Sequence, residues 1–348
     1  IEVQIVGDGQ SPVAHIWERE CSLQRRHQKI VEIAPAPFLA EGVRTRIINA
    51  AMAMADAVKY SGLGTFEFLV DATDTSDDAE FAFLEANARL QVEHTVTEEV
   101  SGVDLVQAQL RIAGGESLAD VGLSHDSPPT LTGMAIQLRV NMETMEADGE
   151  TRPTGGVISA FEPPSGPGIR VDTFGYAGYQ TSPSFDSLLA KQITHVRVDD
   201  FGAAIAKAYR TLSAFRIDGL ETNIGFLQNL LSHEDVKAGR FYTRFVDDHA
   251  PGLAAKGNHD KRFHSAEPDH AKGPGADIDT TDPLAVLAHG QTSSVSAEAA
   301  SETSGPDGTE PVPAPLQGTV ISVSVSEGDL VHAGAEIMVM EAMKMEHV

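Results

Sequence analysis

The sequence predicts a mixed α/β body over about the first 250 residues, followed by a linker and a short all-β segment. Three observations carry this prediction. Apolar residues recur at helical spacing between Val43 and Val58, two strand-like runs flank an Asp- and Thr-rich turn at residues 71–79, and the composition changes near Lys256. A chain of 348 residues is long enough for two domains and a sizeable hydrophobic core.

Two hairpin strands and a second helix complete the predicted body. Residues 64–70 and 80–85 have strand composition, and with the turn between them they predict a β-hairpin with a long loop. Residues 132–140 are a further candidate strand. The second helix is predicted to begin at Phe201, because Asp199 and Asp200 precede it and can cap its amino terminus.

Composition and charge narrow the class of protein. Cys21 is the only cysteine, so an internal disulfide is excluded, and we expect its thiol to pack as a small hydrophobic group. The sequence has no apolar run of membrane-spanning length and does not open with a secretory signal. A formal net charge of -26 opposes binding to nucleic acid or to an anionic membrane. From the composition as a whole, we expect a cytoplasmic protein.

The segment from residue 256 to residue 315 predicts a flexible acidic linker. It is rich in Ala, Gly, Ser, Thr, Pro, Asp and Glu. Such a composition buries too little apolar surface to offset the conformational entropy that folding removes. We therefore expect the linker to separate the α/β body from the β segment.

Polar residues alternate immediately after the second hairpin strand. Glu85, Asn87, Arg89, Gln91 and Glu93 occupy every second position. In an extended backbone, residues two apart point to the same face, so this spacing predicts one polar face that bears all five side chains. The alternative is an exposed strand face held by salt bridges alone.

The predicted hairpin also brings two carboxylates together. Glu67 on the first strand can approach Glu85 on the second. Two carboxylates held close repel each other unless a cation lies between them, and their oxygens, with the amide oxygen of Asn87, suit Mg²⁺ that also binds phosphate. The sequence therefore predicts a metal and phosphate site on this hairpin.

The carboxyl-terminal segment predicts a lysine at the tip of a hairpin. Residues 318–325 and 337–340 have strand composition, and residues 327–329 form a turn. The sequence Ala342-Met343-Lys344-Met345 resembles the turn in which biotin is attached to a carrier-domain lysine. Between Lys272 and Lys344 there is no other Lys or Arg, so Lys344 is the predicted attachment site; the alternative is an ordinary surface lysine.

Several motifs of the body are similar to one known family. The chain resembles the ATP-grasp biotin carboxylase component of biotin-dependent carboxylases from Ile1 to about Asp248. The motifs that carry the resemblance are residues 18–29, 32–37, 64–68, 85–94, 176–179, 185–187 and 218–223. Together with the carrier motif at Lys344, they indicate biotin chemistry twice in one chain.

The resemblance implies an architecture. Residues 1–110 would be the carboxyl-terminal portion of the ATP-grasp domain, and residues 111–250 the biotin carboxylase carboxyl-terminal domain. Residues 251–311 would be the flexible linker, and residues 312–348 the first half of an all-β biotinyl carrier domain. Both ends are then expected to be truncations, with the ATP-grasp lid upstream, so that we do not expect this chain alone to turn over ATP.

The resemblance also implies roles for residues that match motif positions. Glu93 would be the base that deprotonates bicarbonate, and Arg170 would stabilise the biotin enolate. The residues expected to bind ATP are Gln24, His27, Leu69, Glu67 and Glu85, and those expected to bind bicarbonate are Lys29, Arg89, Gln91 and Val92. The expected ligands of Mg²⁺ or Mn²⁺ are Glu67, Glu85 and Asn87. Arg89 is expected to be catalytic as well as to bind bicarbonate.

The activity implied is ATP-dependent carboxylation of biotin on Lys344 with bicarbonate. Residues 139–144 and 162–168 look closest to acyl-CoA carboxylases, while pyruvate carboxylase, urea carboxylase and another ATP-grasp ligase are the alternatives. A non-catalytic carrier or scaffold is a further alternative. The expected partners are a carboxyltransferase domain or subunit, a biotin protein ligase and a second copy of the chain.

Overall fold

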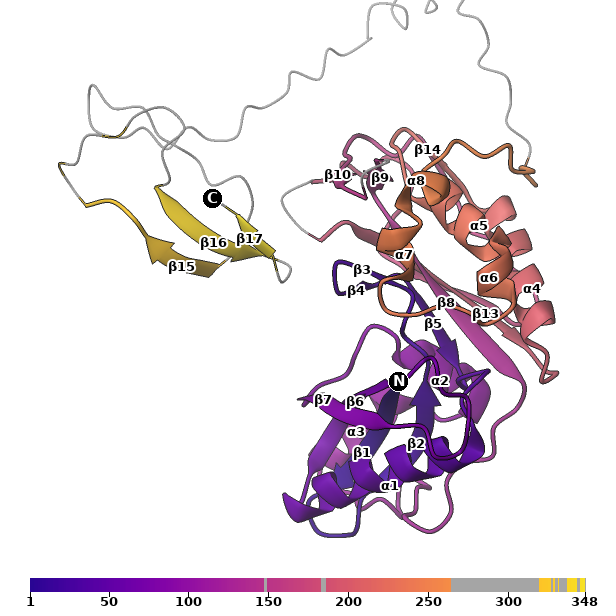
Figure 1. Cartoon of the computed structure of the whole chain (residues 1–348), viewed down its shortest axis with the longest axis vertical. Helices are drawn as coiled ribbons and strands as arrows, with labels where there is room; N and C mark the ends of the chain where they lie inside the picture. Colours follow the sequence, from indigo (N-terminus) through magenta and orange to yellow (C-terminus); the bar gives the residue numbers. More distant parts are fainter. Residues whose placement is uncertain are drawn as a thin grey trace, which may run out of the picture. The chain divides into compact units, whose positions relative to one another are not determined.

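The computed structural model describes residues 1–146, 149–182, 186–263, 319–326, 328, 331, 337–342 and 345–347. Ile1–Phe263 belong to one compact unit, and the strands after residue 318 are described by themselves (Figure 1). Among the helices described, none is both long and apolar enough to cross a membrane.

The unit contains eight described helices and fourteen described strands. The helices are α1 (Glu41–Ala57), α2 (His94–Ser101), α3 (Leu105–Ala113), α4 (Phe201–Ala214), α5 (Ile224–Ser232), α6 (Glu234–Lys237), α7 (Phe245–Asp248) and α8 (Ala250–Leu253). The strands are β1 (Glu2–Asp8), β2 (Ala14–Arg19), β3 (Gln24–Arg25), β4 (Gln28–Lys29), β5 (Val31–Ala34), β6 (Ser61–Val70), β7 (Phe81–Asn87), β8 (Met134–Asn141), β9 (Glu143–Met145), β10 (Thr151–Pro153), β11 (Ala160–Glu162), β12 (Ile169–Thr173), β13 (Leu188–Val196) and β14 (Arg216–Asp218).

The first sheet has the order β2-β1-β6-β7 and is antiparallel throughout. Strand β1 alternates, so that Val3 and Ile5 pack with α1 while Val6 packs on the opposite face with α3. Glu2 and Gln4 share the face of Val6 by the same alternation, and both are buried. The first sheet therefore carries buried polar groups away from α1.

The second sheet has the order β12-β13-β8-β5 and is also antiparallel. Its apolar face packs against α4 and α5 through residues such as Ile136 and Leu138. Gln137 and Arg139 alternate with these residues and point to the other face, where Glu32 of β5 pairs directly with Gln137. Strand β5 precedes β6 and β7 in the chain, yet it belongs to the second sheet. The second sheet therefore includes a strand that lies well before residue 110.

The α2 helix joins the two sheets. It contacts β2 of the first sheet and β5, β8 and β13 of the second. Val96 and Val100 of α2 pack with Ala135 and Ile193 on the second sheet. The polar faces of both sheets therefore meet near the amino end of α2, in the middle of the unit.

Most of the secondary structure expected from sequence is confirmed. The first helix spans Glu41–Ala57, and α4 begins at Phe201 with the Asp200 side chain accepting from the backbone N–H of Ala203, 3.0 Å away. The predicted hairpin is β6 and β7, and the candidate strand at residues 132–140 is β8.

The expectation of one extended polar row is wrong beyond Asn87. Strand β7 ends there, and the chain turns through Arg89 and Gln91 into α2, for which Glu93 is the amino-terminal cap position. The turn is stabilised by the backbone N–H of His94, which donates to the Gln91 carbonyl at 3.3 Å. The alternation therefore does not place the five side chains on one strand face.

The carboxyl-terminal segment contains strands β15 (Thr319–Val323), β16 (Met338–Ala342) and β17 (Met345–His347). Strands β15 and β16 pair antiparallel, as the composition predicts. Gly328 has a positive φ of 96°, which suits the predicted turn. Lys344, the predicted attachment site, lies outside the described residues.

Candidate active site

A cavity of about 720 Å³ opens where the polar faces of the two sheets meet. Most of the residues singled out from the sequence line it. The lining residues among them are Gln24, His27, Lys29, Glu67, Leu69, Glu85, Asn87, Arg89, Gln91, Val92 and Glu93. Residues far apart in the sequence are thus brought together in one site.

The β6–β7 hairpin supplies two facing carboxylates. Glu67 pairs directly with Glu85 across the ladder, as predicted, and a β-bulge between Glu67 and Phe68 shifts the register between this pair and the loop at residues 71–79. The amide nitrogen of Asn87 donates to Glu67 at 3.0 Å and to Glu85 at 2.9 Å. The two facing carboxylates form a donor set of hard oxygens that fits Mg²⁺, while the Asn87 amide presents its nitrogen to both.

A second, very tight hairpin places Lys29 in the cavity. Strands β3 and β4 are joined by Arg26 and His27, which both have positive φ values, of 43° and 64°. Two positive φ values in a two-residue connection match the twist of the flanking strands. The hairpin holds Gln24 and Lys29 opposite each other and exposes His27 at the tip.

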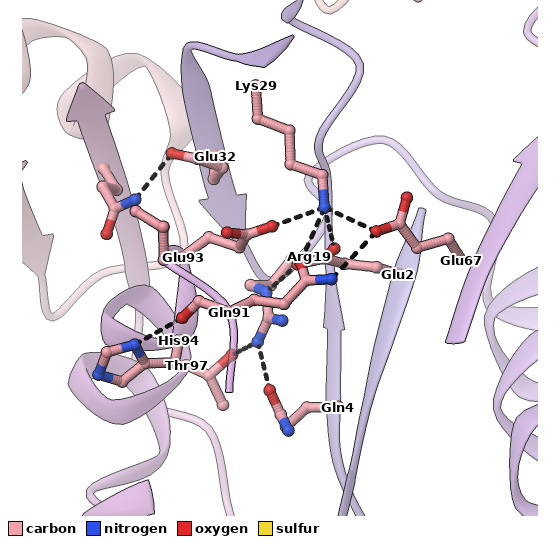
Figure 2. A network of polar contacts seen from close by, with 12 residues as sticks. Glu2, Gln4, Arg19, Lys29, Glu32, Glu67, Gln91, Glu93, His94 and Thr97 are labelled. Atoms are coloured by element: carbon pink, nitrogen blue, oxygen red, sulfur yellow. Dashed lines mark hydrogen bonds and ion pairs between the residues drawn. The ribbon is translucent and has the colours of Figure 1, made fainter. Parts of the chain in front are cut away.

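Lys29 lies among four oxygen acceptors, as Figure 2 shows. Its ammonium group is 2.6 Å from Glu93 Oε1 and 3.0 Å from both Glu67 Oε1 and Gln91 Oε1, and it also contacts Glu2. Burial alone would lower the pKa of Lys29, but the surrounding acidic side chains outweigh burial and raise it. Lys29 is therefore a fixed positive charge in a strongly acidic cavity.

Glu93 is held from two sides. Its Oε1 atom contacts Lys29, and its Oε2 atom accepts from Arg139 Nη2 at 3.0 Å. Only 2% of its side chain is exposed. The next residue, His94, contacts the Gln91 carbonyl through Nδ1 at 2.8 Å, which fixes the turn that precedes α2.

A buried network of side chains holds Glu2, which contacts Lys29 (Figure 2). Arg19 is fully buried and contacts Glu2, and its Nη1 donates to Gln4 at 3.0 Å and to Thr97 of α2 at 2.8 Å. Burial alone would raise the pKa of Glu2, but Arg19 and Lys29 outweigh burial and lower the pKa to about 2. Glu2 is therefore a carboxylate that ties Lys29 to the first sheet.

Arg170 is the one predicted site residue within the described chain that does not line the cavity. Its guanidinium donates to Glu98 of α2 at 2.7 Å and to both oxygens of Asp172, at 2.8 and 3.0 Å. Asp172 also lies 3.3 Å from Lys191, and Lys191 donates to the Val92 carbonyl at 3.0 Å. Arg170 is thus linked to the cavity through two intermediate side chains.

Three family models match consecutive parts of the chain. The ATP-binding domain of the carbamoyl-phosphate synthase L chain matches residues 1–121, the biotin carboxylase C-terminal domain matches residues 137–248, and the biotin-requiring enzyme family matches residues 310–348. The chain therefore has the sequence of a biotin-dependent carboxylase, with segments that match the ATP-binding and C-terminal domains of biotin carboxylase and the biotin-carrier domain. The predicted fold class, ATP-grasp carboxylase domains followed by a biotinyl region, is thereby confirmed.

Individual relatives agree with these domains. Pyruvate carboxylase 1 of Caenorhabditis elegans is 49% identical over 250 residues, which are 72% of this chain but 20% of the relative. The biotin carboxylase domain of a single-chain bacterial carboxylase is 50% identical, with a TM-score of 0.66 over 72% of this chain and 56% of that chain. The structure of a single-chain, multi-domain long-chain acyl-CoA carboxylase is 40% identical, with a TM-score of 0.69 over 99% of this chain and 31% of that chain.

Four residues that support the cavity could not be recognised from the sequence. Glu2, Glu32 and Arg139 contact Lys29 or Glu93 directly or through one another, and Arg19 holds Glu2. Their signal was present in the sequence as polar residues that alternate with apolar ones in β1, β5 and β8. Alternation indicates that a strand has a polar face. It does not show which residues of other strands contact that face.

Cys21 lines the cavity but is itself buried. Burial raises the pKa of its thiol well above the ordinary value. A thiol that stays protonated is a poor nucleophile, which agrees with the sequence-based expectation of a packed, small side chain.

Proposed function

We propose that the chain contributes the biotin carboxylase step of a biotin-dependent carboxylase, in which bicarbonate and ATP carboxylate carrier-bound biotin. One observation carries the proposal: the Glu93 carboxylate lies 2.6 Å from the Lys29 ammonium, beside the facing carboxylates of Glu67 and Glu85. A base, an anion-binding cation and a metal-binding pair in one cavity are the groups that activation of bicarbonate by ATP requires.

The nucleotide would occupy the part of the cavity between the two hairpins. Gln24 and His27 would contact it from the β3–β4 hairpin, and Leu69, whose side chain is exposed beside the cavity, would pack on the base. Glu67, Glu85 and Asn87 would hold the divalent cation. The cation, when bound, supplies positive charge to the phosphate oxygens during phosphoryl transfer.

Bicarbonate would bind beside Lys29, with Arg89, Gln91 and the Val92 backbone. Glu93 accepts the bicarbonate proton as the bicarbonate oxygen attacks the γ-phosphorus, and the bond from that phosphorus to ADP breaks, giving carboxyphosphate. Lys29 and Arg89 balance the charge that develops on the transferred group. Lys29 has three protons and four acceptors, so it can exchange one acceptor for an incoming anion.

The second half of the reaction would use Arg170 and Lys344. Biotin attached to Lys344 would accept the carboxyl group at its ureido nitrogen, with release of phosphate from carboxyphosphate and transfer of the N–H proton to that phosphate. Arg170, in turn, would stabilise the enolate oxygen that develops on biotin. The carboxyltransferase that receives the carboxyl group is a further proposed partner.

Two classes of final acceptor have support among the relatives. The pyruvate carboxylases among the relatives favour pyruvate over the acyl-CoA predicted from the sequence. The long-chain acyl-CoA carboxylase, which aligns with 99% of this chain, keeps an acyl-CoA as the second candidate. Carboxylation assays of the complete protein with radiolabelled bicarbonate, and with either pyruvate or acyl-CoA thioesters, separate the two.

Replacing Glu93 by Gln in the complete protein tests the proposed step. The loss of a positioned base should lower bicarbonate-dependent ATP cleavage by about a hundredfold or more, while binding of Mg²⁺·ATP is retained. Glu116→Gln is a suitable control, because Glu116 pairs with Arg111 on the surface and does not line the cavity. Near-normal turnover of Glu93→Gln would remove Glu93 from the mechanism.

A further inference from the structure

The two oxygens of Glu93 have partners of different kinds. Oε1 contacts Lys29, which is shared among four acceptors, whereas Oε2 contacts Arg139. Lys29 can release one acceptor when an anion arrives, because it has fewer protons than acceptors. The contact between Glu93 Oε2 and Arg139 is supported by another residue, Glu32.

Arg139 is anchored by a carboxylate that water does not reach. Its Nε donates to Glu32 Oε1 at 2.6 Å, and the side chain of Glu32 is 0% exposed. The other oxygen of Glu32 accepts from Gln137 at 2.9 Å. Burial alone would lower the pKa of Arg139, but Glu32 and Glu93 outweigh burial and raise it. Arg139 therefore remains charged and fixed between two carboxylates.

The anchoring uses the geometry of the guanidinium. A guanidinium carries several N–H groups in one rigid plane, so that Nε can bind Glu32 while Nη2 reaches Glu93. Glu32 and Arg139 lie on the adjacent strands β5 and β8 of the second sheet. The sheet thus holds the position of Glu93 Oε2 independently of the first sheet, which carries Glu67 and Glu2.

We propose that Arg139, anchored by Glu32, is a positioning residue that holds Oε2 of Glu93 and leaves Oε1 as the oxygen that accepts the bicarbonate proton. The proposal rests on the proposed role of Glu93 as the base. Lys29 leaves Oε1 for the bound bicarbonate, and the proton passes from the bicarbonate hydroxyl to Oε1. Arg139 prevents the carboxylate from rotating at that moment, because its own contact with Glu32 does not change.

Two variants of the complete protein test this role. Arg139→Lys keeps the positive charge but lacks the fork that binds both carboxylates. Because removing a buried cation can unfold the protein, the second variant is Glu32→Gln with Arg139→Met, which removes the cation and its buried counter-charge together. Both should lower kcat for bicarbonate-dependent ATP cleavage by about tenfold or more, because a misplaced base loses its alignment, while KM for ATP stays within about twofold.

Arg44→Lys is a matched control. The side chain of Arg44 is 17% exposed, as is that of Arg139, and each binds a glutamate whose side chain is 0% exposed, Glu18 for Arg44. Arg44 does not line the cavity. Arg44→Lys should lower the melting temperature without lowering kcat. If Arg139→Lys also lowers the melting temperature and leaves kcat unchanged, its effect is merely structural.

The outcomes separate this proposal from the proposed function. If Glu93→Gln abolishes turnover while both Arg139 variants keep kcat within about twofold of wild type, the positioning role is wrong and the base assignment stands. If Glu93→Gln itself turns over normally, the proposed function fails first. Loss of kcat together with an equal rise of KM for ATP would make Arg139 a structural residue and would also overturn the positioning role.

Discussion

Glu67 and Glu85 lie directly opposite each other on β6 and β7, with the Asn87 amide donating to both carboxylates. Neighbouring carboxylates on a sheet repel each other, so a cation or a donor between them is required. The amide nitrogen meets that need in part, and Lys29 adds a contact to Glu67 at 3.0 Å. The arrangement is suited to exchange these donors for a divalent cation, as the proposed binding of Mg²⁺·ATP requires.

Glu85→Gln should therefore weaken binding of Mg²⁺·ATP by about tenfold or more, because one of two charged ligands of a hard cation is lost. Isothermal titration of the complete protein with Mg²⁺·ATP measures this. Glu80→Gln is the control, since Glu80 is exposed in the loop of the same hairpin and does not line the cavity. Equal affinities in the two variants would exclude Glu85 as a ligand.

The facing carboxylates could be predicted because their cause is local. Two strands joined by one turn must be neighbours, and the residues of one face then follow from the alternation of side chains. The prediction failed after Asn87, where the chain leaves the strand and turns into α2. That turn depends on contacts of α2 with both sheets, which no local pattern encodes.

The supports of the site could not be predicted for a related reason. Glu32 and Arg139 are 107 positions apart, and Arg19 and Thr97 are 78 apart. Each pair depends on which strands become neighbours, and β5 joins the second sheet although it lies in the chain between β2 and β6 of the first. The sequence shows which residues have side chains suited to the chemistry. Their partners become known only from the order of the strands in the sheets.

Arg170→Ala should separate the two partial reactions of the complete protein. Carboxylation of free biotin should fall by about a hundredfold, because the cation proposed to stabilise the developing oxyanion is lost, whereas bicarbonate-dependent ATP cleavage should change far less. Both rates can be followed in the same preparation, one by ADP release and one by incorporation of labelled bicarbonate into biotin.

Arg216→Ala provides the control for Arg170→Ala. Arg216 on β14 binds Asp218 two residues on and Glu162, just as Arg170 binds Asp172 and Glu98. Arg216 does not line the cavity. If Arg170→Ala and Arg216→Ala slow both partial reactions to the same extent, Arg170 is a structural residue.

Lys344 should be the single site of biotin attachment. When the complete protein is produced with a biotin protein ligase, intact-mass measurement should show one biotin on the wild type and none on Lys344→Arg. Lys272→Arg, which changes the nearest preceding lysine, should still gain one biotin. Biotin on another lysine, or lipoate in place of biotin, would contradict the carrier assignment.

The stability of the body should depend on pH through His15. Burial, with the nearby His125, lowers the pKa of His15 from 6.5 to about 4. The unfolded chain then binds the proton at a higher pH than the folded one, so the contribution of His15 to stability is complete above pH 6.5 and is lost as the pH falls toward 4. The full loss amounts to about 3 kcal/mol.

His15→Asn should flatten this dependence. The Asn side-chain oxygen can accept from the Trp17 backbone N–H, as Nδ1 of His15 does at 3.2 Å, but it does not titrate. Urea unfolding followed by circular dichroism at pH 5 and at pH 7 should show a smaller change in the free energy of unfolding for the variant, by about 2 kcal/mol. Since all other titrating groups are common to both proteins, parallel changes in the two would mean that His15 is not the group responsible.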